Sequence, residues 1–255
     1  MNDIAIILLA GVFLPLFPMS MVFNFVFDNI SNTWLRAAFL LAWPLCGLFI
    51  LFEFSSMAAL PDWVVPLALC TSTLYALRML SLREINQWSG FLVTSFWALL
   101  WLAISKNTPE QTLFAYAISI SLPLVLLVLL GDGLTQRFGA AYSGLCGGLA
   151  RTIPRFAGVL VTVIVAAIAT PLFPTFFIML DLIVETMSTT PIIALTLIII
   201  WTLWSWAGSR LIQGLIVGRA SNIKIADLGL ASISIYSMIL IALAIGGVYL
   251  GGVIL

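Results

Sequence analysis

The tetrapeptide Pro-Leu-Phe-Pro occupies residues 15–18 and recurs at residues 171–174, each time inside an apolar run long enough to cross a bilayer. A proline removes one backbone donor and clashes with the preceding turn, so two prolines three residues apart predict a broken helix. We expect the breaks at Pro15 and Pro18 and at Pro171 and Pro174. Paired interruptions are typical of transporters built from structural repeats. The alternative is two ordinary proline kinks whose apolar tetrapeptides match by chance.

Composition identifies the class of protein. Hydrophobic residues make up 63% of the chain and charged residues 8%, and the mean hydropathy is +1.21. Soluble domains carry about a quarter of charged residues. We therefore predict an all-α polytopic membrane protein, and the length allows about 8 transmembrane helices. The predicted spans are residues 4–27, 35–52, 64–80, 88–104, 112–131, 156–180, 191–211 and 230–255.

The basic residues are distributed asymmetrically between the predicted connections. Connections after odd-numbered spans carry Arg36, Arg78, Arg83, Arg137, Arg151, Arg155, Arg210, Arg219 and Lys224, whereas those after even-numbered spans carry Lys106. By the positive-inside rule the odd connections are cytoplasmic, which predicts both termini on the non-cytoplasmic side of a bacterial cytoplasmic (inner) membrane. Acidic and basic residues number 10 each, so we expect no basic surface for nucleic acid.

The residues that carry most enzyme chemistry are scarce. The sequence has no histidine, which excludes imidazole bases and imidazole metal ligands. Its three cysteines, Cys46, Cys70 and Cys146, are far apart and form no CxxC pair, so we interpret them as buried thiols. We therefore expect no cofactor, no metal and no autonomous enzyme.

Two carboxylates are candidates for an ion site. Asp181 and Glu185 are four residues apart and share a helix face just beyond the second break, where a cation could bind. The alternative is a pair of solvated carboxylates at the outer boundary of the membrane. Polar residues expected within the membrane are Asn24, Ser119, Ser121 and Thr175, and such side chains usually bond their own helix or a neighbouring one.

Four segments, in order, carry a resemblance to a known family. Residues 11–24, GVFLPLFPMSMVFN, are similar to a broken helix of the form Lys-x-Pro-Leu-x-Pro-x-His-x-Trp-Leu-Pro. Residues 80–89, LSLREINQWS, are similar to Asp-Leu-Lys-Arg-Leu-Leu-Ala-Tyr-Ser, with Arg83 on its lysine and Ser89 on its serine. Residues 147–157, GGLARTIPRFA, match Gly-Gly-Leu-Ala-Arg-x-x-Pro, and residues 170–180 fall at a second broken helix. From Leu8 to about Gly218 the chain thus resembles the C-terminal part of the antiporter-like subunits of respiratory complex I, Mrp antiporters and energy-converting hydrogenases.

The resemblance implies that the eight spans correspond to the family's seventh to fourteenth helices. The chain would then be a truncated antiporter-like subunit. Residues 1–52 would be the tail of the first repeat, residues 53–211 the second repeat, and residues 212–255 the C-terminal helix. Together they would form a single transmembrane domain.

The resemblance also implies that the family's proton relay has degenerated in this chain. In the family, lysine, glutamate and histidine residues along the middle of the membrane relay protons. The corresponding positions here are Phe13, Ser20, Leu45, Ile120, Leu124 and Met179. Aliphatic and aromatic side chains do not exchange protons, so the resemblance predicts a subunit that does not conduct.

We therefore expect a structural or assembly role in a larger proton-coupled membrane complex. This complex would be of the complex I or hydrogenase type, or an energy-coupled inorganic-carbon uptake system. The expected partners are a full-length antiporter-like or other membrane subunit, a cytoplasmic catalytic subunit and the lipid bilayer. Small residues at Gly246, Gly247 and Gly251 suggest a lipid-facing surface for close helix approach. The alternative function is a self-sufficient proton or cation transporter that uses Asp181 and Glu185.

Overall fold

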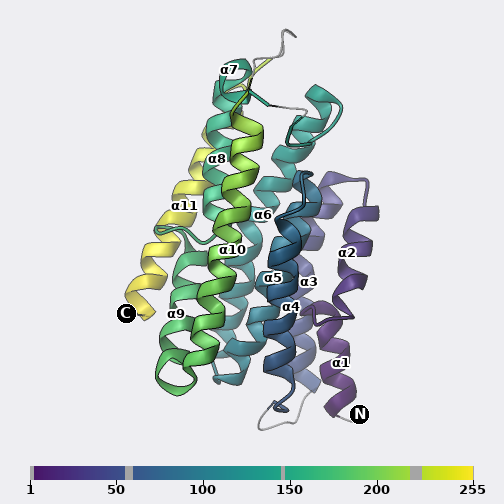
Figure 1. Cartoon of the computed structure of the whole chain (residues 1–255), viewed down its shortest axis with the longest axis vertical. Coiled ribbons are helices and arrows are strands. Elements are labelled where there is room, and N and C mark those ends of the chain that lie inside the picture. The colour runs from purple at the N-terminus through teal and green to yellow at the C-terminus, as the bar shows by residue number, and fades with distance from the viewer. Residues whose placement is uncertain (1–2, 55–59, 145–146, 219–225, 255) are drawn as a thin grey trace.

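The computed structural model describes residues 3–54, 60–144, 147–218 and 226–254. Within them the chain is a bundle of helices that run along one long axis (Figure 1). The helices are α1 (Asp3–Phe13), α2 (Ser20–Asn29), α3 (Thr33–Phe54), α4 (Val64–Met79), α5 (Ile85–Ser105), α6 (Glu110–Phe138), α7 (Leu149–Thr152), α8 (Pro154–Ala167), α9 (Pro174–Thr189), α10 (Pro191–Ile216) and α11 (Leu230–Ile254). The predicted all-α polytopic fold is confirmed.

Both predicted helix breaks are present. Helix α1 ends at Phe13 and α2 begins at Ser20, while α8 ends at Ala167 and α9 begins at Pro174. Single prolines behave differently, because α3 continues through Pro44 and α6 through Pro123. One proline removes one hydrogen bond, whereas the paired prolines remove two neighbouring ones and end the helix. Each pair of half-helices occupies the place of one predicted span.

The chain passes through the two breaks in opposite directions. Helices α1 and α2 lead from the N-terminal end of the bundle to the other end, and α8 and α9 lead back (Figure 1). Five helices are long and apolar enough to cross a membrane, namely α3, α5, α6, α10 and residues 230–252 of α11, while α1, α4 and α8 are shorter apolar helices. The shorter helices include halves of the broken spans.

Helix α5 lies at the centre of the bundle. In its most apolar window 83% of the residues are buried, compared with 17% in α11 at the edge. Trp88, Trp97 and Trp101 of α5 are fully buried. A helix that is hydrophobic on all sides needs neighbours on all sides, and α5 packs against α2, α4 and α6.

Helices α6 and α9 extend well beyond the ends of their predicted spans. Helix α6 continues past Gly131 to Phe138, where Gly139 ends it in the left-handed conformation with φ of 79°. Helix α9 continues past Leu180 to Thr189, because the non-helical residues 168–173 take up part of the chain that was assigned to the membrane. Asp181 and Glu185 therefore lie inside α9 and not beyond a span.

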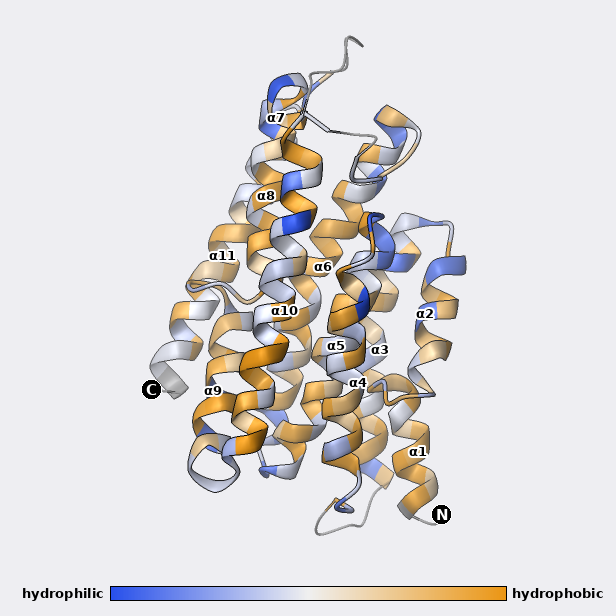
Figure 2. Cartoon of the chain, viewed as in Figure 1, coloured by the Kyte–Doolittle hydropathy of each residue, from blue (hydrophilic) through white to orange (hydrophobic). Residues whose placement is uncertain are grey.

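Hydrophilic residues, coloured blue on the ribbon in Figure 2, are concentrated toward the end of the bundle opposite the N-terminus. The connections from α2 to α3, from α4 to α5 and from α6 to α7 lie at this end (Figure 1). The described basic residues of the odd connections lie in these three connections, in α7, or in the parts of α3, α4, α6, α8 and α10 that are at this end of the bundle. Lys106, which follows α5, lies at the other end. Arg219 and Lys224 lie outside the described residues.

Candidate functional site

At the first break, two tryptophans bond the backbone carbonyls that the helix no longer uses. The indole Nε1 of Trp101 donates to the carbonyl of Leu14 at 2.9 Å, and that of Trp43 donates to the carbonyl of Val12 at 3.1 Å. On the opposite side of the break, the amide of Phe17 donates to the Thr71 hydroxyl at 2.9 Å. In a membrane such groups have no water to bond, so they must find partners within the protein.

At the second break, side-chain donors also bond backbone carbonyls. The indole Nε1 of Trp201 donates to the carbonyl of Ala169 at 2.9 Å, and the Thr175 hydroxyl donates to the carbonyl of Ala166 at 2.8 Å. Ala169 and Leu172 have positive φ angles of 57° and 96°, which turn the chain between the half-helices. The backbone of Leu172 is strained, because a bulky residue other than glycine rarely adopts a positive φ angle.

Sequence reasoning does not single out the tryptophans. Trp43 and Trp201 lie in the middle of apolar spans, where an indole N–H needs an acceptor, and this position is a usable signal. The signal is not specific, however. Trp97 is also in mid-span, and among the described residues its indole nitrogen has no hydrogen-bond partner.

The positions that correspond to the family's relay are apolar and mostly buried. Ile120, Leu124 and Met179 have exposed fractions of 2%, 0% and 1%. Leu45 is partly buried and packs against the core, and the Phe13 ring lies 4.7 Å from the Trp43 ring. These residues fill space between helices and carry no exchangeable proton.

Two of these positions meet across a very small cavity. Ile120 of α6 and Met179 of α9 line the same space of about 10 Å³, together with Tyr116 and apolar side chains of α5, α6 and α9. A water needs at least about 10–15 Å³ and two to four polar partners. Its lining is apolar apart from Tyr116, and a space of about 10 Å³ has no room for a chain of several waters.

Ser20 is the polar exception among these positions. It is fully buried and its hydroxyl accepts a hydrogen bond from Tyr75 of α4 at 3.0 Å. One turn later Asn24 donates from Nδ2 to the carbonyl of Ser20 at 3.0 Å and to the hydroxyl of Thr94 at 3.1 Å. These bonds join α2 to α4 and α5 without a charged group.

A second buried set of hydroxyls continues toward α10. The hydroxyls of Ser72 and Ser95 are 2.9 Å apart, and the Trp204 indole donates to the Ser95 hydroxyl at 2.9 Å. The Trp204 ring also stacks on Phe96 at 3.9 Å. Of the polar residues expected in the membrane, Asn24, Ser121 and Thr175 are buried and bond helix backbone as predicted, and Ser119 is partly buried.

The two carboxylates of α9 have different surroundings. Asp181 is partly buried and accepts a hydrogen bond from the Tyr116 hydroxyl at 2.6 Å. Glu185 is exposed one turn further, near the end of the bundle where the Lys106 ammonium donates to Thr189 at 2.9 Å. Among the described residues no group of three Cys, Asp or Glu side chains could hold a metal ion. Asp181 thus has a hydrogen-bond partner in Tyr116, and Glu185 is exposed.

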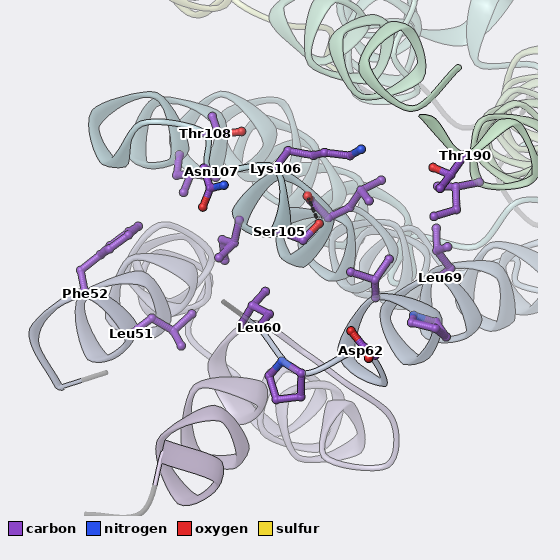
Figure 3. A pocket seen from close by; sticks show the side chains of 17 residues that line it. Leu51, Phe52, Leu60, Asp62, Leu69, Ser105, Lys106, Asn107, Thr108 and Thr190 are labelled. Atoms are coloured by element: carbon purple, nitrogen blue, oxygen red, sulfur yellow. Dashed lines mark hydrogen bonds between the residues drawn. The ribbon is translucent and has the colours of Figure 1, made fainter. Parts of the chain in front are cut away.

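A broad hollow of about 790 Å³ opens at the same end of the bundle (Figure 3). Asp62, Ser105, Lys106 and Thr190 lie at its polar parts, and Leu51, Leu69, Leu102 and Leu113 are among its apolar lining. Neither Asp181 nor Glu185 lines it. None of the buried hydroxyls of Ser20, Ser72, Thr94 and Ser95 is among its lining residues either.

Solved membrane complexes contain chains with this fold. No family model and no curated protein sequence matches the chain. A chain of respiratory complex I from Thermus thermophilus with bound NADH superposes with a TM-score of 0.82 at 18% identity, covering 98% of this chain and 55% of that one. A chain of the Mrp complex from Dietzia sp. DQ12-45-1b gives 0.76 at 16% identity, with coverage of 86% and 42%.

A third similar structure is that of the membrane-bound sulfane sulfur reductase, an archaeal respiratory membrane complex. It gives a TM-score of 0.81 at 15% identity and covers 96% of this chain and 52% of that one. The chain thus spans about half the length of the solved chains that it matches. Likeness at such low identity establishes fold, and the resemblance to antiporter-like subunits is confirmed at that level. The chain is a multi-pass membrane protein with the fold of membrane subunits from the complex I and Mrp type of assembly.

Proposed function

We propose that the chain is a non-conducting, antiporter-like subunit with a structural role in a larger proton-coupled membrane complex. The main observation in support is that Ile120 and Met179 line one small, largely apolar cavity, where the resemblance places proton-carrying groups. Burying a charge in a membrane is costly, and a subunit that only packs against others has no need of one. The carbonyls at both breaks bond to tryptophans, so the breaks are compatible with a packing role.

The division into repeats is part of the proposal. Residues 1–52 are the tail of one repeat, residues 53–211 a second repeat, and residues 212–255 a C-terminal helix. The opposite directions of the two Pro-Leu-Phe-Pro breaks support an inverted relationship between the repeats (Figure 1). A full-length antiporter-like subunit or another membrane subunit is the proposed neighbour.

The proposed location is a bacterial cytoplasmic membrane, with the basic end of the bundle on the cytoplasmic side. A cytoplasmic catalytic subunit would then dock at the basic end. The assembly is of the complex I or hydrogenase type, or an energy-coupled inorganic-carbon uptake system. Purification of the tagged chain in a mild detergent, followed by identification of the co-purified subunits, distinguishes between these assemblies.

Flux through the isolated chain tests the non-conducting role. We expect proteoliposomes that contain the purified chain to hold an imposed pH gradient or sodium gradient as well as protein-free liposomes do. A protonophore added at the end of each trace provides the positive control. Ion-selective flux that disappears in Asp181→Asn with Glu185→Gln would refute the proposal and establish the alternative, a transporter that uses these carboxylates.

Activity of the whole complex provides the complementary test. In the complex, the same double substitution should leave activity close to that of the wild type, because a structural subunit needs neither Asp181 nor Glu185 for proton transfer. Deleting the chain should instead reduce the amount of assembled complex. Normal assembly without the chain, or a loss of activity in the double variant with assembly intact, would contradict a structural role.

A further inference from the structure

The seam between α4 and α10 contains an open apolar groove. The two helices pack against each other, and a groove of about 610 Å³ follows the exposed side of α4. Leu69, Thr73, Leu77 and Thr196 are among its lining residues, and Arg78 stands at one end. The groove is open to the outside along an apolar helix, so in a bilayer the acyl chains would have access to it.

A second, more polar hollow of about 270 Å³ continues the seam at the basic end of the bundle. Arg83 and Arg210 both line it, together with Ser143 and Gln213. Helix α4 contributes to both, since Leu77 and Arg78 line the groove while Met79 and the following Leu80 line the hollow. The α4/α10 seam therefore has an apolar groove along the helices and a hollow lined by two arginines at the basic end of the bundle.

The arginines of this seam are available to an external anion. In the part of the chain that the structure describes, no carboxylate forms an ion pair with Arg83 or Arg210, and both side chains are exposed. Arg78 lines the groove, and its guanidinium lies 5.2 Å from the centre of the Phe91 ring on α5. Guanidinium groups bind phosphate through paired N–H donors.

We propose that the α4/α10 seam is a binding site for one anionic phospholipid. Its phosphate lies between Arg83 and Arg210, with Arg78 beside it, and an acyl chain fills the groove along Leu69 and Leu77. Basic pockets between transmembrane helices are suited to anionic lipid headgroups. Charge complementarity favours an anionic lipid over a neutral one, and the adjoining groove favours a lipid over free phosphate. The site is independent of whether the chain conducts protons.

Native mass spectrometry of the full chain in a neutral detergent tests the site. The probe is phosphatidylglycerol, and the matched lipid is phosphatidylcholine with the same acyl chains. We expect the wild-type chain to retain phosphatidylglycerol preferentially. Removing each arginine should weaken its binding about fivefold, and Arg83→Gln with Arg210→Gln about 20- to 30-fold. Arg151→Gln, the same charge change on α7 at the same end of the bundle, should leave binding unchanged.

A groove-filling variant separates a lipid from a free anion. Leu77 is 51% exposed, so Leu77→Trp should fold normally while it obstructs the acyl chain and weakens phosphatidylglycerol binding with all arginines present. Equal retention of the two lipids, an equal loss in Arg151→Gln, or a Leu77→Trp chain that binds like the wild type would overturn the proposal. Inorganic phosphate that displaces the lipid at equal concentration would reassign the arginines to a soluble anion. Loss of the lipid on assembly would make the seam a subunit interface.

Discussion

Gly247 is the point where α11 meets the second break. A methyl group at Gly247 would lie 2.3 Å from the carbonyl oxygen of Leu172, 2.8 Å from the carbonyl carbon of Phe173 and 2.9 Å from the nitrogen of Pro174. All three atoms belong to the backbone and cannot turn aside. The prediction of a lipid-facing glycine surface is therefore wrong for Gly247, because this glycine faces the chain's own helix break. For its neighbour Gly246 the environment is open, with no atom within 4 Å of the added carbon.

The size of the effect follows from these distances. Ordinary van der Waals contact begins near 3.4 Å, so Gly247→Ala requires a displacement of about 1.1 Å between α11 and the break, from 3.4 minus 2.3. Overpacking of this kind costs about 1–3 kcal/mol. Gly246→Ala meets no atom and should gain up to about 1 kcal/mol from the better helix propensity of alanine. Gly251→Ala should be intermediate, since its carbon would approach a Phe177 ring atom at 2.5 Å and a ring can rotate.

Thermal unfolding of the purified variants in one detergent measures this order. For a chain of this size a Tm shift of about 2–4 °C is expected for each kcal/mol. Gly247→Ala should unfold first, Gly251→Ala next, and Gly246→Ala at or above the wild-type temperature. A Gly247→Ala chain that is as stable as Gly246→Ala would refute the close approach of α11 to the break.

Three further predictions concern topology, the breaks and a helix cap. A reporter fused after the last residue should be active on the non-cytoplasmic side, and one inserted between α6 and α7 in the cytoplasm; the reverse pattern would contradict the orientation. Trp101→Phe leaves the carbonyl at the first break without its donor and should cost about 1–3 kcal/mol in thermal unfolding, whereas Trp206→Phe, at a residue 58% exposed, should be neutral. Asp227 accepts hydrogen bonds from three backbone amides, two of them at the start of α8, at 2.7–3.0 Å. Partial burial raises the pKa of Asp227, but these donors and Arg155 outweigh burial and lower it below its usual value. Its stabilisation should therefore be complete above about pH 4, the unfolded pKa, and disappear as pH falls through the lower folded value. Asp227→Ala should cost about 1 kcal/mol at neutral pH and flatten this acid dependence, and an unchanged pH profile would contradict the cap.

The sequence is sufficient to predict the helix breaks, because a proline pair acts through local sterics that no tertiary contact reverses. The sequence also predicts the membrane spans, because polar side chains are energetically unfavourable in lipid and segments that cross a bilayer are therefore long and apolar. The ends of α6 and α9 are not predicted correctly. Gly131 is followed by two more helical turns, which end only at the left-handed Gly139. An apolar pattern reports membrane depth, and a helix can continue past that depth.

The candidate site is less accessible to sequence reasoning. The apolar character of Ile120 and Met179 is visible in the sequence, but their place on one shared cavity depends on how α6 and α9 pack. The hydrogen bonds of Ser72, Ser95 and Trp204 join residues up to 109 positions apart, and no local pattern identifies them. Serines in apolar helices usually bond their own backbone, so the sequence does not distinguish a buried cross-helix network from that ordinary case.

Each helix break is stabilised by two uncharged features, a tryptophan indole and a glycine on a neighbouring helix. These features explain how the chain keeps broken helices like those of a transporter without charged residues at the breaks. An indole N–H satisfies a freed carbonyl, and it has no proton to exchange at physiological pH. A glycine of a neighbouring helix lets the irregular backbone approach closely. At the first break the carbon of an alanine at Gly47 would lie 2.9 Å from Leu14 and Phe13 side-chain atoms, and at the second break Gly247 meets the carbonyl of Leu172. The carbonyls of Val12, Leu14 and Ala169 are thus bonded within the protein and need no ion there. A break that is bonded and packed in this way can persist for its shape alone, as a surface that fits the neighbouring helices.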